Sequence, residues 1–193
     1  MKNIRTKQEI LENHRIILIF GVPCAGKSIL TYNTFVKNNE IKECVDIMKY
    51  TQIDNYCLLG KYPSDNSRRG LDTLERKQVG NFATQIINLL NQDKVVILEG
   101  VRCVSRPMLS KLSLKDVLFL FIDCDLNVAL TRANNSRKEK DDKQMRGIKA
   151  TYTLCTNFIN DFKDKVDTFV INTSSCNDFE EKTLFDFEWL EIK

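Results

Sequence analysis

The sequence predicts an α/β fold, with a doubly wound, five-stranded parallel sheet in one domain of residues 1–193. Five apolar runs rich in β-branched residues alternate with segments of helical periodicity. The runs are nearly continuous, which is typical of parallel strands that are covered on both faces. We expect strands at residues 15–20, 44–51, 94–99, 116–123 and 168–172.

Helices are expected between these strands and at both ends of the chain. A short helix precedes the first strand, and a broad apolar stripe containing Phe82 and Ile86 predicts a core helix before the third strand. The last stretch, residues 178–193, is expected to form a final helix that packs Phe185 and Trp189 onto the sheet.

A phosphate-binding loop follows the first strand. Gly21, Gly26, Lys27 and Ser28 match G-x-x-x-x-G-K-[ST] without a mismatch, between an apolar strand and a helix-compatible run. Backbone N–H groups of such a loop, together with the helix N-terminus, surround phosphate oxygens. The expected nucleotide-binding residues are Gly21, Val22, Pro23, Cys24, Ala25, Gly26, Lys27, Ser28 and Ile29.

This motif assigns chemistry to two side chains. Lys27 would bridge the terminal phosphates of a nucleoside triphosphate, and the Ser28 hydroxyl would ligate Mg²⁺. ATP and Mg²⁺ are therefore the expected cofactors.

Ligands of open α/β sheets bind beyond the carboxyl ends of the strands. Asp54, Glu99 and Arg102 follow the second and third predicted strands, whereas the single histidine, His14, precedes the first strand. A general base at this edge would therefore be a carboxylate. Glu99 is the first choice, either to hold a Mg²⁺-bound water or to accept the acceptor's proton, and Asp54 is the rival candidate.

A lid is predicted at residues 131–149, after the fourth strand and a short helix. This stretch carries seven basic and three acidic residues, including Arg132 and Arg137, and lacks large apolar side chains from 133 to 144. A solvated segment with little to bury is expected to move, as a lid over a transferring phosphoryl group must.

Other nucleotide-binding classes fit less well. The chain lacks the N-K-x-D guanine-reading motif of GTPases and the Asp-Glu dipeptide of many ATPases. A carboxylate after the third strand and an arginine-rich lid after the fourth are the combination that a small kinase needs.

The loop at 21–28 and the run Ile122-Asp-Cys-Asp-Leu-Asn-Val-Ala-Leu-Thr-Arg132 resemble the nucleoside and nucleotide kinase branch of P-loop proteins. Gly60-Lys-Tyr, Gly70-Leu-Asp-Thr-Leu and Glu99-Gly-Val-Arg resemble a narrower group, the bacteriophage-type P-loop kinases, which include kinases of 5-hydroxymethyluracil in DNA. Leu71 stands where that group's pattern has Thr.

The resemblance implies roles for further residues. Arg69 and Asp72 would help to hold the acceptor, and Lys61 and Tyr62 would line its pocket, although Tyr62-Pro63 is equally compatible with a plain turn. Arg102 and the lid arginines, Arg132 and Arg137, would neutralise transferring charge. Ser174 and its neighbour, after the fifth strand, resemble the loop that lies near adenine in such kinases.

Three functions remain open at this level. The first is a kinase that moves the γ-phosphate of ATP to a nucleotide-type acceptor, such as the hydroxymethyl group of a modified pyrimidine in DNA. The second is a kinase of free (deoxy)nucleoside monophosphates. The third is an ATP-binding sensor without phosphotransfer.

Charge and composition are compatible with polyanionic ligands. The net charge is +3, but nine acids and four lysines from residue 160 onward leave +8 on the first 159 residues. Seven cysteines without a C-x-x-C pair argue against a disulfide framework or a zinc site. No run of apolar residues is long enough to span a membrane, and no signal peptide is recognised, so we expect a cytoplasmic protein, in the host cytoplasm if it is viral.

Overall fold

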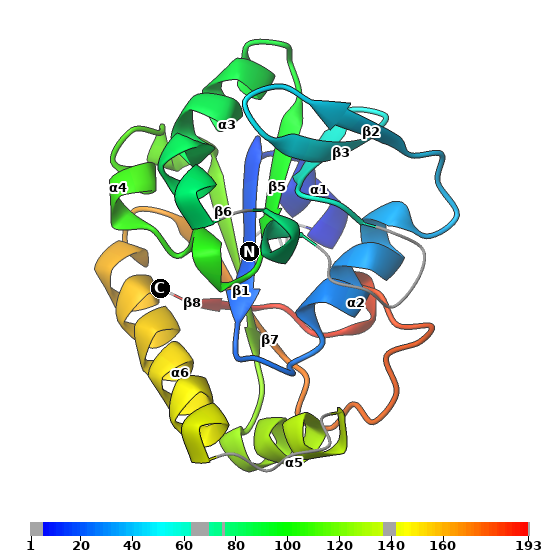
Figure 1. Cartoon of the computed structure of the whole chain (residues 1–193), viewed down its shortest axis with the longest axis vertical. Coiled ribbons are helices and arrows are strands. Elements are labelled where there is room, and N and C mark those ends of the chain that lie inside the picture. Colours follow the sequence, from blue (N-terminus) through cyan, green and yellow to red (C-terminus); the bar gives the residue numbers. More distant parts are fainter. Residues whose placement is uncertain (1–5, 63–69, 75, 137–141, 193) are drawn as a thin grey trace, which may run out of the picture.

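The computed structural model describes residues 6–62, 70–74, 76–136 and 142–192. Within them lies one eight-stranded mixed sheet in the order β2-β3-β4-β5-β1-β6-β7-β8 (Figure 1). Its strands are β1 (Ile16–Gly21), β2 (Lys42–Val45), β3 (Lys49–Ile53), β4 (Tyr56–Leu59), β5 (Val95–Glu99), β6 (Val117–Asp123), β7 (Asp167–Asn172) and β8 (Leu190–Ile192).

The α/β class is confirmed, but the prediction of a purely parallel five-stranded sheet is wrong. Strands β4, β5, β1, β6 and β7 pair in parallel, and antiparallel strands extend both edges of this central part. On one side β2 and β3 form a hairpin that pairs with β4, and on the other side β8 pairs with β7. The edge strands therefore make the sheet mixed.

The expected second strand at 44–51 does not exist as one strand. Its residues belong to β2 and β3, which are joined by a turn in which Asp46 N–H donates to the Met48 carbonyl. The Met48 side chain is buried against the helix at residues 82–90, and the Met48 N–H donates to Oε1 of Gln85 in that helix. A largely exposed turn with apolar residues, of which Met48 alone is buried, thus resembled a strand in sequence, and the short parallel strand β4 was missed.

Helices cover both faces of the sheet (Figure 1). The α-helices are α1 (Lys7–Glu12), α2 (Lys27–Thr31), α3 (Phe82–Leu90), α4 (Arg106–Leu109), α5 (Leu126–Ser136) and α6 (Asp142–Phe162). A π-helix, Tyr32–Val36, continues α2, and the 3₁₀ turns are Leu71–Thr73, Arg76–Asn81, Val101–Cys103, Leu114–Asp116 and Leu184–Asp186. None of the helices in the described residues is long and apolar enough to cross a membrane.

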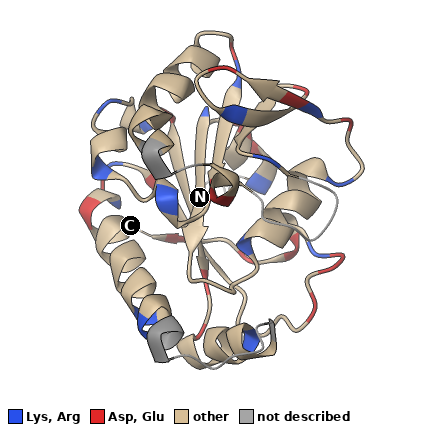
Figure 2. Ribbon diagram, viewed as in Figure 1, with Lys and Arg blue, Asp and Glu red and all other residues tan. Residues whose placement is uncertain are grey.

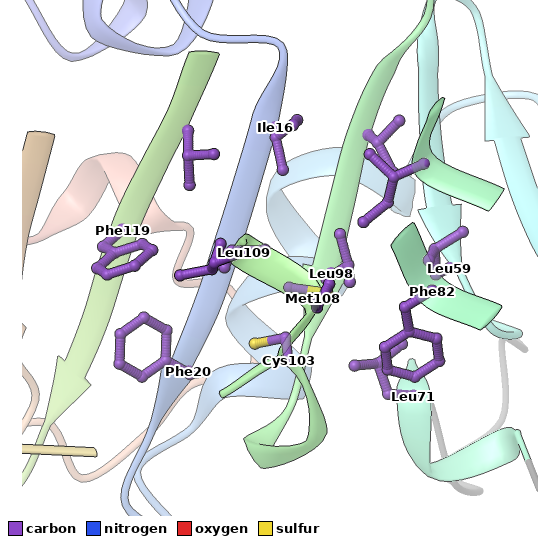
Figure 3. Close-up of a cluster of buried hydrophobic side chains, with 14 of the residues drawn as sticks. Ile16, Phe20, Leu59, Leu71, Phe82, Leu98, Cys103, Met108, Leu109 and Phe119 are labelled. Carbon is purple, nitrogen blue, oxygen red and sulfur yellow. The ribbon is translucent and has the colours of Figure 1, made fainter. Parts of the chain in front are cut away.

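Alternate residues of β1 enter two separate cores, because successive side chains of a strand point to opposite faces. Ile16, Leu18 and Phe20 pack with α3, α4 and α6, and Figure 3 shows part of this cluster around Phe20 and Phe119. Ile17 and Ile19 pack on the other face with α1, α2 and α5. This two-sided burial explains the continuous apolar strand and holds the carboxyl ends of the parallel strands at one edge.

The C-terminal segment differs from the helix predicted for 178–193. It contains a 3₁₀ turn and β8, and Phe185 stacks on Trp189 with a centroid distance of 6.3 Å. Asn33 anchors the segment, because its side-chain amide donates to the carbonyls of Phe179, Glu180 and Lys182. The segment therefore lies along α2 and the π-helix that continues it.

Buried thiols should make the protein less stable in alkali. Burial raises the pKa of Cys57 and of Cys155 to about 11, and that of Cys103 well above its usual value of 9.0. Above about pH 9 these thiols ionise in the unfolded chain and remain protonated in the native protein. The unfolded state then binds fewer protons, so the free energy of unfolding should fall by about 1.4 kcal/mol per pH unit for each thiol.

Urea unfolding at pH 8, 9 and 10 measures this dependence. Cys155→Ala should make the free energy of unfolding fall less steeply with pH, by the contribution of one thiol. Cys176→Ala, at a partly exposed position, should leave this pH dependence as in the wild type. Equal slopes for the wild type and Cys155→Ala would contradict the prediction.

Candidate functional site

The phosphate-loop sequence forms the connection between β1 and α2. Gly21 and Gly26 have φ angles of 148° and 88°, and Cys24 between them also has a positive φ, of 63°. Glycine at 21 is required by space as well, because a Cβ there would lie 2.0 Å from the Ile122 carbonyl oxygen of β6. The loop therefore turns sharply away from the sheet and enters the helix at Lys27.

Lys27, Ser28 and Glu99 come together at the end of this loop. Lys27 Nζ donates to the Val22 carbonyl at 2.7 Å, across the loop. Ser28 Oγ donates to Glu99 Oε1 at 3.1 Å. Glu99 ends β5 beside β1 and is only 3% exposed. The predicted proximity of Glu99 and the phosphate loop is thus what the fold produces.

The donor set suits Mg²⁺. A hydroxyl oxygen and a carboxylate oxygen are hard ligands, and Mg²⁺ commonly binds one or two such side chains together with substrate phosphates. The described residues contain no group of three or more His, Cys, Asp and Glu side chains that could hold a metal by themselves. Ser28 and Glu99 are accordingly the residues that could hold Mg²⁺ beside bound phosphates.

Asp54 does not join this cluster, so its predicted placement is wrong. It lies in the turn between β3 and β4, where its φ is 48°. Because β3 is antiparallel to β4, this turn is at the amino edge of the parallel strands, beside the start of β5, where Lys94 Nζ donates to the Asp54 carbonyl. The error came from taking β2 and β3 as one parallel strand.

The predicted acceptor residues are only partly brought together. Arg102 Nη1 donates to the carbonyls of Leu71 and Leu74, and Arg102 Nε lies 4.0 Å from the carboxylate of Asp72. Lys61 Nζ instead forms an ion pair with Glu43 of β2, at 2.7 Å. Arg102 thus fastens the 71–74 turn to the end of β5. Arg69 lies outside the described residues.

The end of β4 and the 70–74 turn pack tightly against Glu99. Gly70 N–H donates to the Lys61 carbonyl at 2.9 Å, and a Cβ on Gly60 would lie 2.0 Å from the Gly70 carbonyl oxygen. Tyr62, immediately after this contact, is 1% exposed. The chain segments on either side of residues 63–69 therefore meet, and Gly70 lies against Glu99, because a Cβ on Gly70 would be 2.5 Å from Glu99 Oε2.

The guanidinium of Arg132 is held by the loop after β7. It donates to the carbonyls of Thr173 at 2.7 Å and Cys176 at 2.5 Å, in that loop. It also lies over the Phe179 ring, 5.0 Å from the ring centroid. The described parts of the predicted lid, 131–136 and 142–149, are helical, and Arg137 lies outside the described residues.

A pocket of about 310 Å³ opens beside the phosphate loop. It is lined by Cys24, Gly26, Arg132, Asn177 and Phe179. Its aromatic and guanidinium groups offer flat surfaces on which a planar base can stack.

Phe179 brings the C-terminal segment into direct contact with the phosphate loop. A Cβ on Gly26 would lie 2.5 Å from this ring, so only glycine allows the approach. Sequence reasoning missed Phe179 and Asn177. The available signal was their position after the last parallel strand, whose carboxyl end lies at the same edge of the sheet.

Polar groups at the carboxyl ends of β6 and β7 complete this side of the site. Burial raises the pKa of Asp123, although a hydrogen bond from the Cys124 N–H acts in the opposite direction. Thr173 Oγ1 donates to the Ala25 carbonyl at 3.0 Å and thereby ties the loop after β7 to the phosphate loop. Asp125 caps the start of α5, where its Oδ1 accepts from the N–H groups of Asn127 and Val128.

No protein-family model and no curated protein sequence matches this chain.

Proposed function

We propose that this protein is an ATP-dependent phosphotransferase that moves the γ-phosphate to a nucleotide-type acceptor. The observation that carries the proposal is the junction of Lys27, Ser28 and the buried Glu99 at the end of a glycine-dependent loop. This arrangement provides a cation for terminal phosphates and two oxygen ligands for Mg²⁺. Bound Mg²⁺ would neutralise part of the negative charge of the phosphates.

The residues of the chain divide the remaining work. The loop N–H groups and Lys27 would hold the donor phosphates, and the neighbouring pocket at Arg132 and Phe179 would take the donor base. Glu99 would orient a Mg²⁺-bound water or accept the proton of the acceptor hydroxyl. Its burial limits the approach of bulk water, which strengthens these electrostatic interactions.

For the acceptor we propose a 5-hydroxymethyl pyrimidine in DNA. Support comes from the motifs at 60–62, 70–74 and 99–102, whose described residues meet beside Glu99. The +8 charge on the first 159 residues favours a polyanionic substrate. Figure 2 shows that positive and negative residues are interspersed on the outer elements, while the central strand β1 carries none.

The test is ADP production from ATP and Mg²⁺ with panels of nucleosides, nucleotides and hydroxymethylated DNA, with labelled phosphate followed into the products. We expect DNA that contains the hydroxymethyl pyrimidine to stimulate ADP release and to carry the label. Label in a small nucleotide would indicate the nucleoside monophosphate kinase. ATP binding without acceptor-dependent ADP release would indicate the sensor, and absence of ATP binding would overturn all three.

A further inference from the structure

Asn33 binds the C-terminal segment to the helix that follows the phosphate loop. The residue lies in the π-helix that continues α2 and is 9% exposed. Its side-chain Nδ2 donates to the carbonyls of Phe179 at 2.9 Å, Glu180 at 3.0 Å and Lys182 at 2.8 Å. These carbonyls belong to one turn, in which the Lys182 N–H also donates to the Phe179 carbonyl. Because carbonyl oxygens only accept hydrogen bonds, the amide NH₂ group of Asn33 fits this turn and a carboxylate would not.

The turn that Asn33 holds places the Phe179 ring on the phosphate loop. A Cβ on Gly26 would lie 2.5 Å from this ring, and the Arg132 guanidinium lies 5.0 Å from the ring centroid. The carbonyl of Cys176, three residues before Phe179, accepts from Arg132 at 2.5 Å. The backbone that carries the ring is thus held at residue 176 by Arg132 and at residue 179 by Asn33.

The Phe179 ring forms part of the pocket beside the phosphate loop. Its described lining residues are Cys24, Gly26, Arg132, Asn177 and Phe179. Asn33 is not one of these described residues, so its effect on a ligand in the pocket passes through the turn at 179–182. An aromatic ring whose backbone is already fixed loses less conformational freedom when a planar base stacks on it.

We propose that Asn33 is a positioning residue for the donor nucleotide, because it fixes the Phe179 ring as the stacking surface for the base. It acts on the base and not on the phosphates, since the turn it holds carries the ring, whereas residues 21–28 form the phosphate loop. This inference rests on the proposed function, which places a nucleotide's phosphates in that loop. Stacking of a base on an aromatic side chain raises affinity by about 5- to 150-fold.

Calorimetry in the presence of Mg²⁺ measures this with two probes, a non-hydrolysable ATP analogue and inorganic tripolyphosphate, which has the phosphates without the base. Asn33→Ala should weaken binding of the analogue about 10-fold and change binding of tripolyphosphate by less than about twofold. Asn33→Asp keeps the size of the side chain but removes the donor, so it should weaken the analogue at least as much. The matched control is Asn39→Ala, whose exposed amide donates to the Phe35 carbonyl, and it should keep both affinities.

A double-mutant cycle with Phe179→Ala separates positioning from a general loss of structure, and it requires only the ATP analogue. Phe179→Ala should itself weaken the analogue, because it removes the stacking surface. In that background Asn33→Ala should cause no further loss, since its effect passes through the ring. A residue that only stabilised the fold would weaken binding in both backgrounds.

Three results would overturn the role of Asn33 and leave the proposed function in place. These are equal affinities of Asn33→Ala and Asn39→Ala for the analogue, an equal loss of both probes in Asn33→Ala, and a full further loss in the Phe179→Ala background. If the wild type binds both probes equally well, the base gains nothing from the pocket, and this inference fails while phosphate binding stands. If the wild type binds neither probe, the proposed function fails as well.

Discussion

Replacement of Lys27 by alanine should lower the rate of phosphate transfer by about 10²- to 10³-fold, the usual cost of removing one preorganised group from a site where charge develops. Lys27 is the first residue of α2, and its Nζ lies across the phosphate loop at the Val22 carbonyl, 2.7 Å away. From this position the ammonium group would reach the terminal phosphates of a nucleotide bound by the loop. The loss should appear mainly in kcat if the contact strengthens as the γ-phosphate leaves.

The fold should survive this change. Lys27 loses one hydrogen bond to a carbonyl at a partly exposed position, which costs about 1 kcal/mol of stability. The matched control is Lys37→Ala, which breaks an ion pair with Glu181 and should keep the wild-type rate. Turnover is measured as acceptor-dependent ADP release, and thermal unfolding checks the fold. A Lys27→Ala variant with wild-type turnover would exclude the proposed donor site.

Gly21→Ala is expected to destabilise the protein by at least about 3 kcal/mol. The φ of 148° is unfavourable for an L-residue, and the new Cβ would lie 2.0 Å from the Ile122 carbonyl oxygen. Movement of the backbone to relieve this contact would cost free energy, because Gly21 and Ile122 are paired at the carboxyl ends of two adjacent parallel strands, β1 and β6. Since the displaced backbone begins the phosphate loop, ATP affinity should fall together with stability.

Gly147→Ala is the control for this substitution. Gly147 lies inside α6, and a Cβ there meets no atom within 4 Å. Alanine at this place should stabilise the protein by about 0.5–1 kcal/mol, because it lowers the backbone entropy of the unfolded chain and favours the helix. Urea unfolding of both variants gives the comparison. Equal stabilities would show that neither the φ nor the contact at Gly21 constrains the loop.

Some parts of the fold could be predicted because they depend on local patterns. β1, β5, β6 and β7 are continuous apolar runs whose neighbours on both faces are helices, so burial alone identifies them. The strands at the β2–β4 edge of the sheet were not predicted correctly, because their residues lack such a local pattern. Strand β4 has only four residues, and β2 is largely exposed, so neither carries a strong pattern. Pairing with β5 and β3 decides that these residues are strands.

The same distinction applies to the arginines. Arginine-rich composition predicts a charged segment, but it does not say which partner each guanidinium takes. Arg102 meets the carbonyls of Leu71 and Leu74, and Arg132 meets those of Thr173 and Cys176. All four carbonyls are distant in sequence from the arginine that binds them. Their positions follow from loop conformation, which side-chain chemistry alone does not specify.

The sequence by itself predicted the phosphate loop, and the backbone conformation and close contacts of the structure require glycine at 21 and 26. It also determined the α/β class, since continuous apolar strands must be covered on both faces. Only the tertiary structure decided that Asp54 lies at the far edge and that Glu99 meets Ser28. It likewise decided that Gly70 lies against the carboxylate of Glu99. These relations join residues up to 71 positions apart, and strand order and direction determine them rather than any local pattern.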